Sequence, residues 1–350
     1  MIRGMDIWGN PSSVHRTGQD ARHTLDTARR TMAECLQTRA ERIIFTSGGT
    51  EANNLALRGM AARNPGSTIL VSSIEHDCIR TTANTLHAQN IAHVEEIPVT
   101  PEGIVNMDWL THRLTRSPVA MVSVMHANNE TGVIQPIEYI SSICRKHGAT
   151  FHTDAVQTVG HLPIHFEALG ADMLTLSAHK FGGPKGAGAL VVKPEIPLNS
   201  VITGGAQERN RRAGTENTMA IMGMAAALES AMSAMDEETR AANTWAKSLE
   251  KGLPSTIHMV APKAEKVPHV RQFLTPGLKG EDAVIALDLQ GIAASQGAAC
   301  SSGRVSASHV LQAMGFSEHE AAEGLRLSWG WATTESDIHR AITALQTLVK

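Results

Sequence analysis

The chain has 350 residues, of which 42% are hydrophobic and 19% charged, a composition typical of a folded globular protein. At about 150 residues per domain, this length predicts two domains. The formal net charge is only −3, which argues against a broad basic surface, so we expect neither nucleic acid nor a membrane as a direct partner.

The first part of the chain alternates strand and helix patterns. Apolar residues at helical spacing predict a first helix over 22–37. Short β-branched runs predict strands over 69–73, 93–99, 120–126, 149–153, 173–177 and 188–192. Helical patterns lie over 51–61, 78–89, 107–114 and 137–147. This alternation is typical of βαβ units and predicts an α/β fold with a mainly parallel sheet covered by helices.

A long helix-forming stretch over 219–253 follows. Its most apolar part is interrupted by Glu229 and two serines, so we interpret it as a buried helix, because a membrane span needs about 20 nearly uncharged residues. A helix that crosses between two domains would have this length. We place the boundary near Met235, with a large domain over 9–235 and a smaller domain over 236–350 together with 1–8. In the smaller domain, strands are predicted over 283–289 and 324–329.

Polar residues follow several of these strands at the point where the strand ends. They are Gly48-Gly49-Thr50, His76, Asn128-Asn129, Asp154 with Gln157, and Ser177-Ala178-His179-Lys180. Parallel sheets bind their ligands at the carboxyl ends of the strands. We therefore expect these residues to form one site.

The glycine pair Gly48-Gly49 leads through Thr50 into the predicted helix over 51–61. Glycines allow close approach of the backbone, and the start of a helix offers N–H groups and a positive dipole end, which suits phosphate. The same residues are also compatible with an ordinary capped turn. Neither the GxxxxGK[ST] loop nor the GxGxxG fingerprint occurs in the chain.

Lys180 enters a glycine-rich loop directly after a predicted strand, and Asp154 ends an apolar one. A buried lysine with a depressed pKa can form a Schiff base, although Lys185 is an obvious rival. A carboxylate at the end of an apolar strand needs a cationic partner. Pyridoxal phosphate requires this pair, a lysine for its aldehyde and an acid for its pyridinium nitrogen.

A metal site is the competing interpretation of the same strand ends. Its candidate ligands are His76, His126, His152, Asp154 and His179. Alternation along a strand places His152 and Asp154 on one face. However, no HExxH spacing occurs, and a metal would leave the glycine pair and the lysine unexplained.

The four cysteines, Cys35, Cys78, Cys144 and Cys300, lie far apart without a CxxC pair. This argues against a zinc knuckle or a disulfide framework and favours a reducing compartment. The segment MIRGMDIWGN lacks the apolar run of a secretory signal. We therefore expect a cytoplasmic protein.

Two residues of the predicted smaller domain could carry chemistry. Cys300 lies in the small-residue loop SQGAACSSG, where a thiol is suited to nucleophilic attack. Arg326 interrupts an apolar strand, either as an edge residue whose charge reaches solvent or as a bidentate clamp for a carboxylate.

Taken together, the motifs resemble those of a known family. GNPSSVH, FTSGGTEANN, SSIEHD, HANNETG, HTDAVQ, SAHKFGGPKG, RRAGTEN and GAACSSG occur in this order. The chain closely resembles the cysteine desulfurases, which are fold-type I enzymes dependent on pyridoxal phosphate (PLP) in the class V aminotransferase family. The SQGAACSSG loop resembles the group I, iron–sulfur and nitrogen-fixation branch. The resemblance runs from about Gly9 to Leu345 and implies a large PLP-binding domain with a seven-stranded sheet and a smaller α+β domain.

The resemblance also implies roles for particular residues. Lys180 forms the internal aldimine, Asp154 binds the pyridinium nitrogen, Gln157 binds the phenolic oxygen, and His76 stacks on the ring and moves protons. The phosphate is held by Gly49, Thr50, Ser177, His179 and, from the neighbouring subunit of a homodimer, Thr215. Asn129 and Arg326 bind the substrate carboxylate, Asn129 also belongs to the cofactor-binding residues, and Cys300 attacks the sulfur. Cys78, two residues from His76, is interpreted as a bystander.

The implied reaction converts L-cysteine to L-alanine and leaves a persulfide on Cys300. The sulfur then passes to an acceptor protein, a scaffold or carrier, for iron–sulfur cluster assembly or for other thio-cofactor or tRNA pathways. Three alternatives remain open: a selenocysteine lyase, a cysteine desulfhydrase, and a weakly active paralogue that acts as a binding partner in a sulfur-transfer complex.

The chain departs from the family pattern before GNPSSVH. Family members carry a short segment there with a Tyr-Leu-Asp…Ala-Thr-Thr-like motif, whereas MIRGMDIW does not contain it. In the family this segment packs in the small domain and borders the substrate pocket. We expect cofactor binding to be unaffected and substrate affinity, stability and turnover to be sensitive to the difference.

Overall fold

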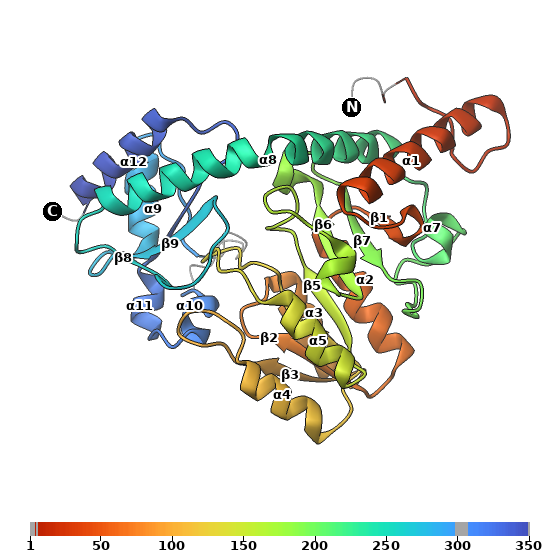
Figure 1. Ribbon diagram of the computed structural model, residues 1–350, viewed down its shortest axis with the longest axis horizontal. Coiled ribbons are helices and arrows are strands. Elements are labelled where there is room, and N and C mark those ends of the chain that lie inside the picture. Colours follow the sequence, from red (N-terminus) through yellow and green to blue (C-terminus); the bar gives the residue numbers. More distant parts are fainter. Residues whose placement is uncertain (1–3, 5, 298–306, 349–350) are drawn as a thin grey trace.

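The computed structural model describes residues 4, 6–297 and 307–348, and they form a larger α/β unit and a smaller α+β unit connected by one long helix (Figure 1). The larger unit is built on a seven-stranded sheet in the order β1-β7-β6-β5-β4-β2-β3. Its strands are β1 Ile43–Thr46, β2 Thr68–Ser72, β3 His93–Ile97, β4 Met121–Ser123, β5 Thr150–Asp154, β6 Met173–Ser177 and β7 Gly188–Val192. β7 alone runs antiparallel to its neighbours in this sheet, so the expected mainly parallel α/β sheet is confirmed.

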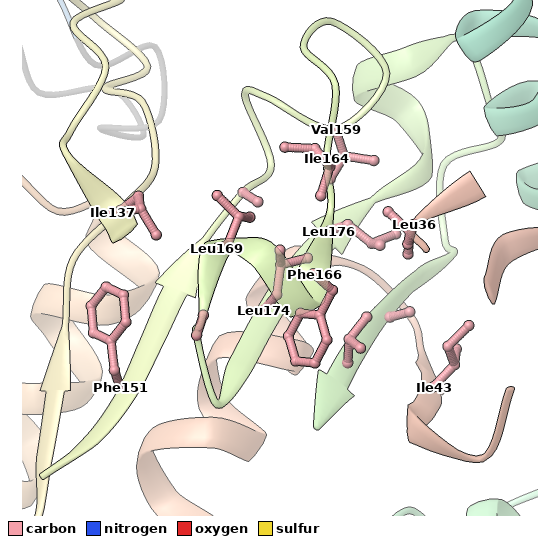
Figure 2. Close-up of a cluster of buried hydrophobic side chains, with 14 of the residues drawn as sticks. Leu36, Ile43, Ile137, Phe151, Val159, Ile164, Phe166, Leu169, Leu174 and Leu176 are labelled. Atoms are coloured by element: carbon pink, nitrogen blue, oxygen red, sulfur yellow. The ribbon is translucent and has the colours of Figure 1, made fainter. Parts of the chain in front are cut away.

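Helices cover both faces of this sheet. The helices of this unit are α1 Arg16–Cys35, α2 Gly49–Arg63, α3 Asp77–Ala88, α4 Met107–Arg116, α5 Ile137–Lys146, α6 Phe166–Leu169 and α7 Gln207–Asn210, with the 3-10 turns η2 Ala40–Arg42 and η3 Ala178–Phe181. Side chains alternate across each strand, so Leu70 joins the core beneath α1, α4, α5 and α8, whereas Ile69 and Val71 join the core beneath α2 and α3. Figure 2 shows part of the first core, around Phe151 and Phe166.

The smaller unit is built on a three-stranded antiparallel sheet in the order β10-β9-β8. Its elements are β8 His258–Met259, β9 Val270–Leu274, α9 Gly280–Asp288, α10 His309–Ala313, α11 Glu318–Ala322, β10 Gly324–Ser328 and α12 Glu335–Leu348. The strand predicted over 324–329 is present as β10. The strand predicted over 283–289 is wrong, because this apolar run lies in α9. Ala283 and Leu287, four residues apart, are buried while Ile285 is 55% exposed, which is the spacing of a helix.

Helix α8, Thr218–Gly252, joins the two units and has 35 residues, or roughly 52 Å at 1.5 Å per residue. By length and composition it is apolar enough to cross a membrane. Its first half contributes Met224 and Leu228 to the core of the larger unit, and its second half contributes Ala246 and Leu249 to the core of the smaller unit. The helix therefore packs within the protein on both sides of the predicted boundary.

Gly4 lies near the beginning of α8. Gly4 is close to Met219 and Met222, with the Met222 sulfur 3.2 Å from where a Cβ of Gly4 would lie. Figure 1 shows α1 beside the first half of α8, on the side away from the smaller unit. Gly4, in the segment that we grouped with the smaller domain, thus packs on the larger unit.

A buried ion pair fixes the segment before α8. The Arg29 guanidinium of α1 donates to both carboxylate oxygens of Glu208, at 2.8 and 2.7 Å, and to the Ile43 carbonyl at 2.6 Å. Glu208 also accepts from the Phe45 amide at 2.9 Å. These contacts hold Glu208 in a left-handed conformation with φ of 44°, which costs an L-residue free energy. The ion pair therefore joins α1, β1 and the 207–217 segment.

We expect Glu208→Gln to lower the free energy of unfolding by about 3 kcal/mol, because it leaves a buried guanidinium without its countercharge. Urea unfolding measures this change. Asp26→Asn is the matched control, since its ion pair with Arg22 is exposed on both sides, and exposed pairs contribute less than about 1 kcal/mol. Equal effects of the two variants would contradict this interpretation of the pair.

Candidate active site

The strand ends predicted to carry the site lie at one edge of the large sheet. Thr46 of β1 and Ser177 of β6 both pair with Gly188 of β7, and Asp154 of β5 pairs with Thr175 of β6. The chain adds β3 on one side of β2 and then returns to place β4 on the other side. Such a reversal is where α/β sheets bind their ligands.

The start of α2 forms the expected glycine cradle beside Ser177. A Cβ on Gly49 would lie 2.9 Å from Val156 Cγ2 and 3.5 Å from Ser177 Cβ, so only glycine fits here without displacement of its neighbours. The Ser177 hydroxyl lies 3.0 Å from His179 Nδ1. The first amides of a helix have no partner within it. With Thr50 in the first turn, this edge can bind an anion such as phosphate.

Asp154 is a buried carboxyl group whose two oxygens each accept a hydrogen bond. Oδ1 accepts from the Val156 amide at 2.9 Å and Oδ2 from Asn53 Nδ2 at 2.6 Å. Burial raises the pKa of Asp154, against the opposing effect of these donors and of the nearby His76 and Lys180. A carboxylate has about four lone-pair positions, so Asp154 can still accept from a cationic N–H group, as a pyridinium nitrogen provides.

His76 follows β2 and is the N-cap residue of α3. Its Nδ1 accepts from the Cys78 backbone amide at 3.1 Å. This bond fixes the ring at the start of the helix and makes Nε2 the nitrogen that carries or exchanges a proton.

Lys180 lies in the wall of a cavity of about 620 Å³ between the two units. Four other predicted site residues line the same cavity, namely Asn129, Gln157, His179 and Arg326. The Lys180 carbonyl lies 2.9 Å from His161 Nε2, which ties the 3-10 turn to the loop after β5. Lys180 and its rival Lys185 are both exposed, but Lys185 is not part of this wall, so the position of Lys180 favours it as the lysine of the site.

Arg326 brings the smaller unit to the cavity. Its Nη1 donates to the Asn129 carbonyl at 2.9 Å, which orients the guanidinium toward the loop after β4. The adjacent residue Glu130 is buried and accepts from the Ser308 hydroxyl. Burial raises the pKa of Glu130 to about 7.

Two histidines also join the units at the cavity wall. His161 of the larger unit stacks on His269 of the smaller unit, with ring centroids 3.9 Å apart. His269 Nε2 lies 3.5 Å from Gln157 Oε1. Burial lowers the pKa of both histidines, so both rings are neutral at pH 7, when stacking carries no repulsion.

Not every predicted site residue lies together with the others. Thr215 is exposed and is not part of the cavity wall in this single chain. Asn128, predicted beside Asn129, has a structural position, because its side chain bonds the Ile74 carbonyl and the Glu130 and Thr131 amides. Cys300 lies outside the described residues.

Two of the histidines considered for a metal, His126 and His152, bind hydroxyl groups. His152 is buried, with Nδ1 at 2.9 Å from the Ser123 hydroxyl and Nε2 at 3.1 Å from the Thr175 hydroxyl. His126 Nδ1 lies 3.0 Å from the Thr158 hydroxyl. Over residues 4, 6–297 and 307–348, no three His, Cys, Asp or Glu side chains are grouped to hold a metal ion.

Three residues near the site were missed as contributors. Asn53 binds Asp154, Glu75 precedes His76 and is fully buried, and Cys78 contacts the His76 ring. Of these three, only Asn53 could have been found from the sequence. It is a polar residue four positions after Gly49, and this spacing places it on the same face of α2 as the glycine cradle.

Glu75 makes the stability of the fold depend on pH. It accepts from the Ser72 hydroxyl and the Met125 amide, both at 2.7 Å, and burial raises its pKa from 4.5 to about 8. The folded protein therefore holds a proton between these pH values that the unfolded chain releases, so stability falls as pH rises through this window.

We expect Glu75→Gln to remove this loss of stability with rising pH. The free energy of unfolding of the variant should exceed that of the wild type by on the order of 2–5 kcal/mol at pH 8 and be close to the wild-type value at pH 4.5. Urea unfolding across this range measures the difference. Glu96→Gln, at an exposed position of β3, should leave the pH dependence unchanged. A Glu75→Gln variant with the wild-type pH dependence would contradict the assignment.

Comparisons with known proteins identify the family. The Aminotransferase class-V family model matches residues 5–341. The cysteine desulfurase IscS of Dictyoglomus turgidum is 38% identical over 349 residues, covering 98% of this chain and 88% of that protein. The cysteine desulfurase of Sinorhizobium fredii is 40% identical over 350 residues, covering 99% and 90%. The solved NifS-like protein from Rickettsia africae superposes with a TM-score of 0.90 at 33% identity, covering 99% and 93%.

Both the resemblance and the fold expected from the motifs are thereby confirmed. The chain belongs to the class-V aminotransferase family and, within it, to the cysteine desulfurases.

Proposed function

We propose that this protein uses PLP to convert L-cysteine to L-alanine and transfers the sulfur to Cys300 as a persulfide. The observation that carries the proposal is the position of the buried Asp154 carboxyl group. It lies at the same sheet edge as the α2 glycine cradle, and close enough to Lys180 for the lysine charge to lower its pKa. A solved structure of SspA in complex with cysteine resembles this chain, with a TM-score of 0.80 at 28% identity over 93% of this chain and 92% of that one. This likeness supports cysteine as the substrate.

The residues present fit the cofactor. Lys180 would hold its aldehyde carbon, Asp154 its ring nitrogen and Gln157 its phenolic oxygen. The phosphate would be held by the first α2 amides with Thr50, Ser177 and His179. When bound, PLP withdraws electrons from the bonds at the substrate α-carbon.

Arg326 and Asn129 would bind the substrate carboxylate. The bond from Arg326 Nη1 to the Asn129 carbonyl fixes the plane of the guanidinium, and a guanidinium of fixed orientation can hold a carboxylate with two parallel hydrogen bonds. Because Arg326 belongs to the smaller unit, substrate binding depends on how the two units are packed.

His76 and Cys300 would carry the proton and sulfur transfers. The His76 ring, with Nδ1 occupied by an amide, exchanges protons through Nε2. The Cys300 thiolate attacks the substrate sulfur, a new S–S bond forms, and the substrate C–S bond breaks with its electron pair moving to carbon. Protonation of that carbon gives alanine, and the persulfide stays on Cys300 for transfer to an acceptor protein, such as an iron–sulfur scaffold.

We expect the PLP-loaded protein, given L-cysteine and a reducing thiol, to form alanine and sulfide in equal amounts. Quantification of both products measures this. Cys300→Ala should abolish both, because the sulfur then has no acceptor. Pyruvate in place of alanine would instead identify a desulfhydrase, and cofactor binding without turnover would favour the weakly active paralogue that acts as a binding partner.

Lys180→Ala and Lys185→Ala form a matched pair for this proposal. Borohydride reduction followed by peptide mass analysis should find PLP attached at residue 180 in the wild type and in Lys185→Ala, and on no lysine in Lys180→Ala. Attachment at Lys185 would contradict the assignment.

We also propose a homodimer in which Thr215 contributes to the phosphate site of the other subunit. Thr215 is exposed in a segment that also exposes Val201 and Ile202, each by 41%. Sedimentation velocity should give twice the chain mass, and Thr215→Val should weaken PLP binding without changing that mass. A monomer that binds PLP with full affinity would contradict this arrangement.

A further inference from the structure

The side chain of Cys78 lies between three residues of the proposed cofactor site. Its Sγ is 3.1 Å from His76 Nδ1 and 3.1 Å from Asn53 Nδ2. The Thr50 side chain is also within hydrogen-bonding reach of the sulfur. One sulfur atom thus contacts the residue expected to stack on the ring, a residue of the phosphate cradle and the amide that binds Asp154.

The direction of each hydrogen bond follows from the chemistry of the partners. The Asn53 amide nitrogen has two hydrogens, and its neighbours are Asp154 Oδ2 at 2.6 Å and Cys78 Sγ at 3.1 Å, so it donates one to each. His76 Nδ1 already accepts from the Cys78 backbone amide and therefore carries no hydrogen. The remaining donor in the contact between Nδ1 and Sγ is the thiol S–H.

The thiol keeps its proton at neutral pH. Burial, with the nearby Asp154 carboxyl as a further cause, raises the pKa of Cys78 to about 12. Cys78 thus acts as a neutral donor and not as a nucleophile. The sulfur also packs against the core beneath α2 and α3, which fixes its position relative to both helices.

We propose that Cys78 is a positioning residue for His76. Its S–H and its backbone N–H both donate to His76 Nδ1, and its contact with Asn53 couples the His76 ring to Asp154. The proposal rests on the proposed function, since it assigns the orientation of a ring that acts on bound PLP. The result is a continuous hydrogen-bonded chain from Asp154 through Asn53 and Cys78 to His76. Chains of this kind strengthen each bond and restrict the side chains they join.

The test compares Cys78→Ala and Cys78→Ser with the wild type in three measurements. These are the dissociation constant of PLP for the apoprotein, the kcat and KM for L-cysteine, and the melting temperature of the apoprotein. Alanine keeps the backbone donor and loses the side-chain donor. We expect it to weaken PLP binding and lower kcat by about five- to tenfold each, the factor for one net hydrogen bond, while KM stays unchanged because Asn129 and Arg326 are untouched.

Serine keeps a side-chain donor and acceptor, so Cys78→Ser should recover most of both losses. Cys144→Ala is the matched control, because burial raises the pKa of that thiol to about 12 as well, whereas Cys144 lies on α5 in the core that includes Ile140 and Phe151. It should leave PLP binding and kcat unchanged.

Several outcomes would overturn the proposal. They are a Cys78→Ala protein with wild-type PLP affinity and kcat, equal losses in the serine and alanine variants, and a lowered melting temperature without a change in PLP affinity. Failure of the proposed function is distinguishable, because the wild type itself would then produce no alanine from L-cysteine.

Discussion

The buried carboxyl group of Asp154 is the constraint around which the rest of the site is arranged. It ends a strand in the interior of the sheet, where an unpaired charge is costly. Asn53 from α2 and the Val156 amide supply its hydrogen bonds, and burial still raises its pKa. The site is thus prepared for a cationic hydrogen-bond donor, and the residues that would hold the remainder of PLP lie on the neighbouring strand ends.

Much of this arrangement could be predicted from the sequence, because the physics of parallel sheets is regular. Once the β-branched runs are assigned to parallel strands, the polar residues that follow them must meet at one edge. The expected sheet, its edge and the position of Lys180 followed from this reasoning. It failed for α9, where a short run of Ala283 to Leu287 contains residues that favour strands, and the burial of Ala283 and Leu287 against the smaller core decides the helix.

The supporting contacts could not be predicted, because they join residues that are distant in sequence and ordinary in type. Asn53 meets Asp154 across 101 positions, and Glu130 meets Ser308 across 178. Nothing local in a sequence specifies such a pair. Cys78 was interpreted as a bystander for the same reason. Its neighbour Asn53 is 25 positions away, and only the packing of α2 against α3 brings the two side chains into contact.

The cavity wall shows why the two units have to be considered together. Three contacts join the smaller unit to the loops that follow β4 and β5. They are the hydrogen bonds from Arg326 to the Asn129 carbonyl and from Ser308 to Glu130, and the stacking of His269 on His161. Arg326, proposed to bind the carboxylate, belongs to the smaller unit, whereas Asn129 and the residues proposed to hold the cofactor belong to the larger one. The continuous helix α8 packs into both cores and thus limits how far the units can move apart. The position of Arg326 relative to Lys180 and Asp154 is therefore set by the packing between the units, and the Arg326–Asn129 contact is part of that packing.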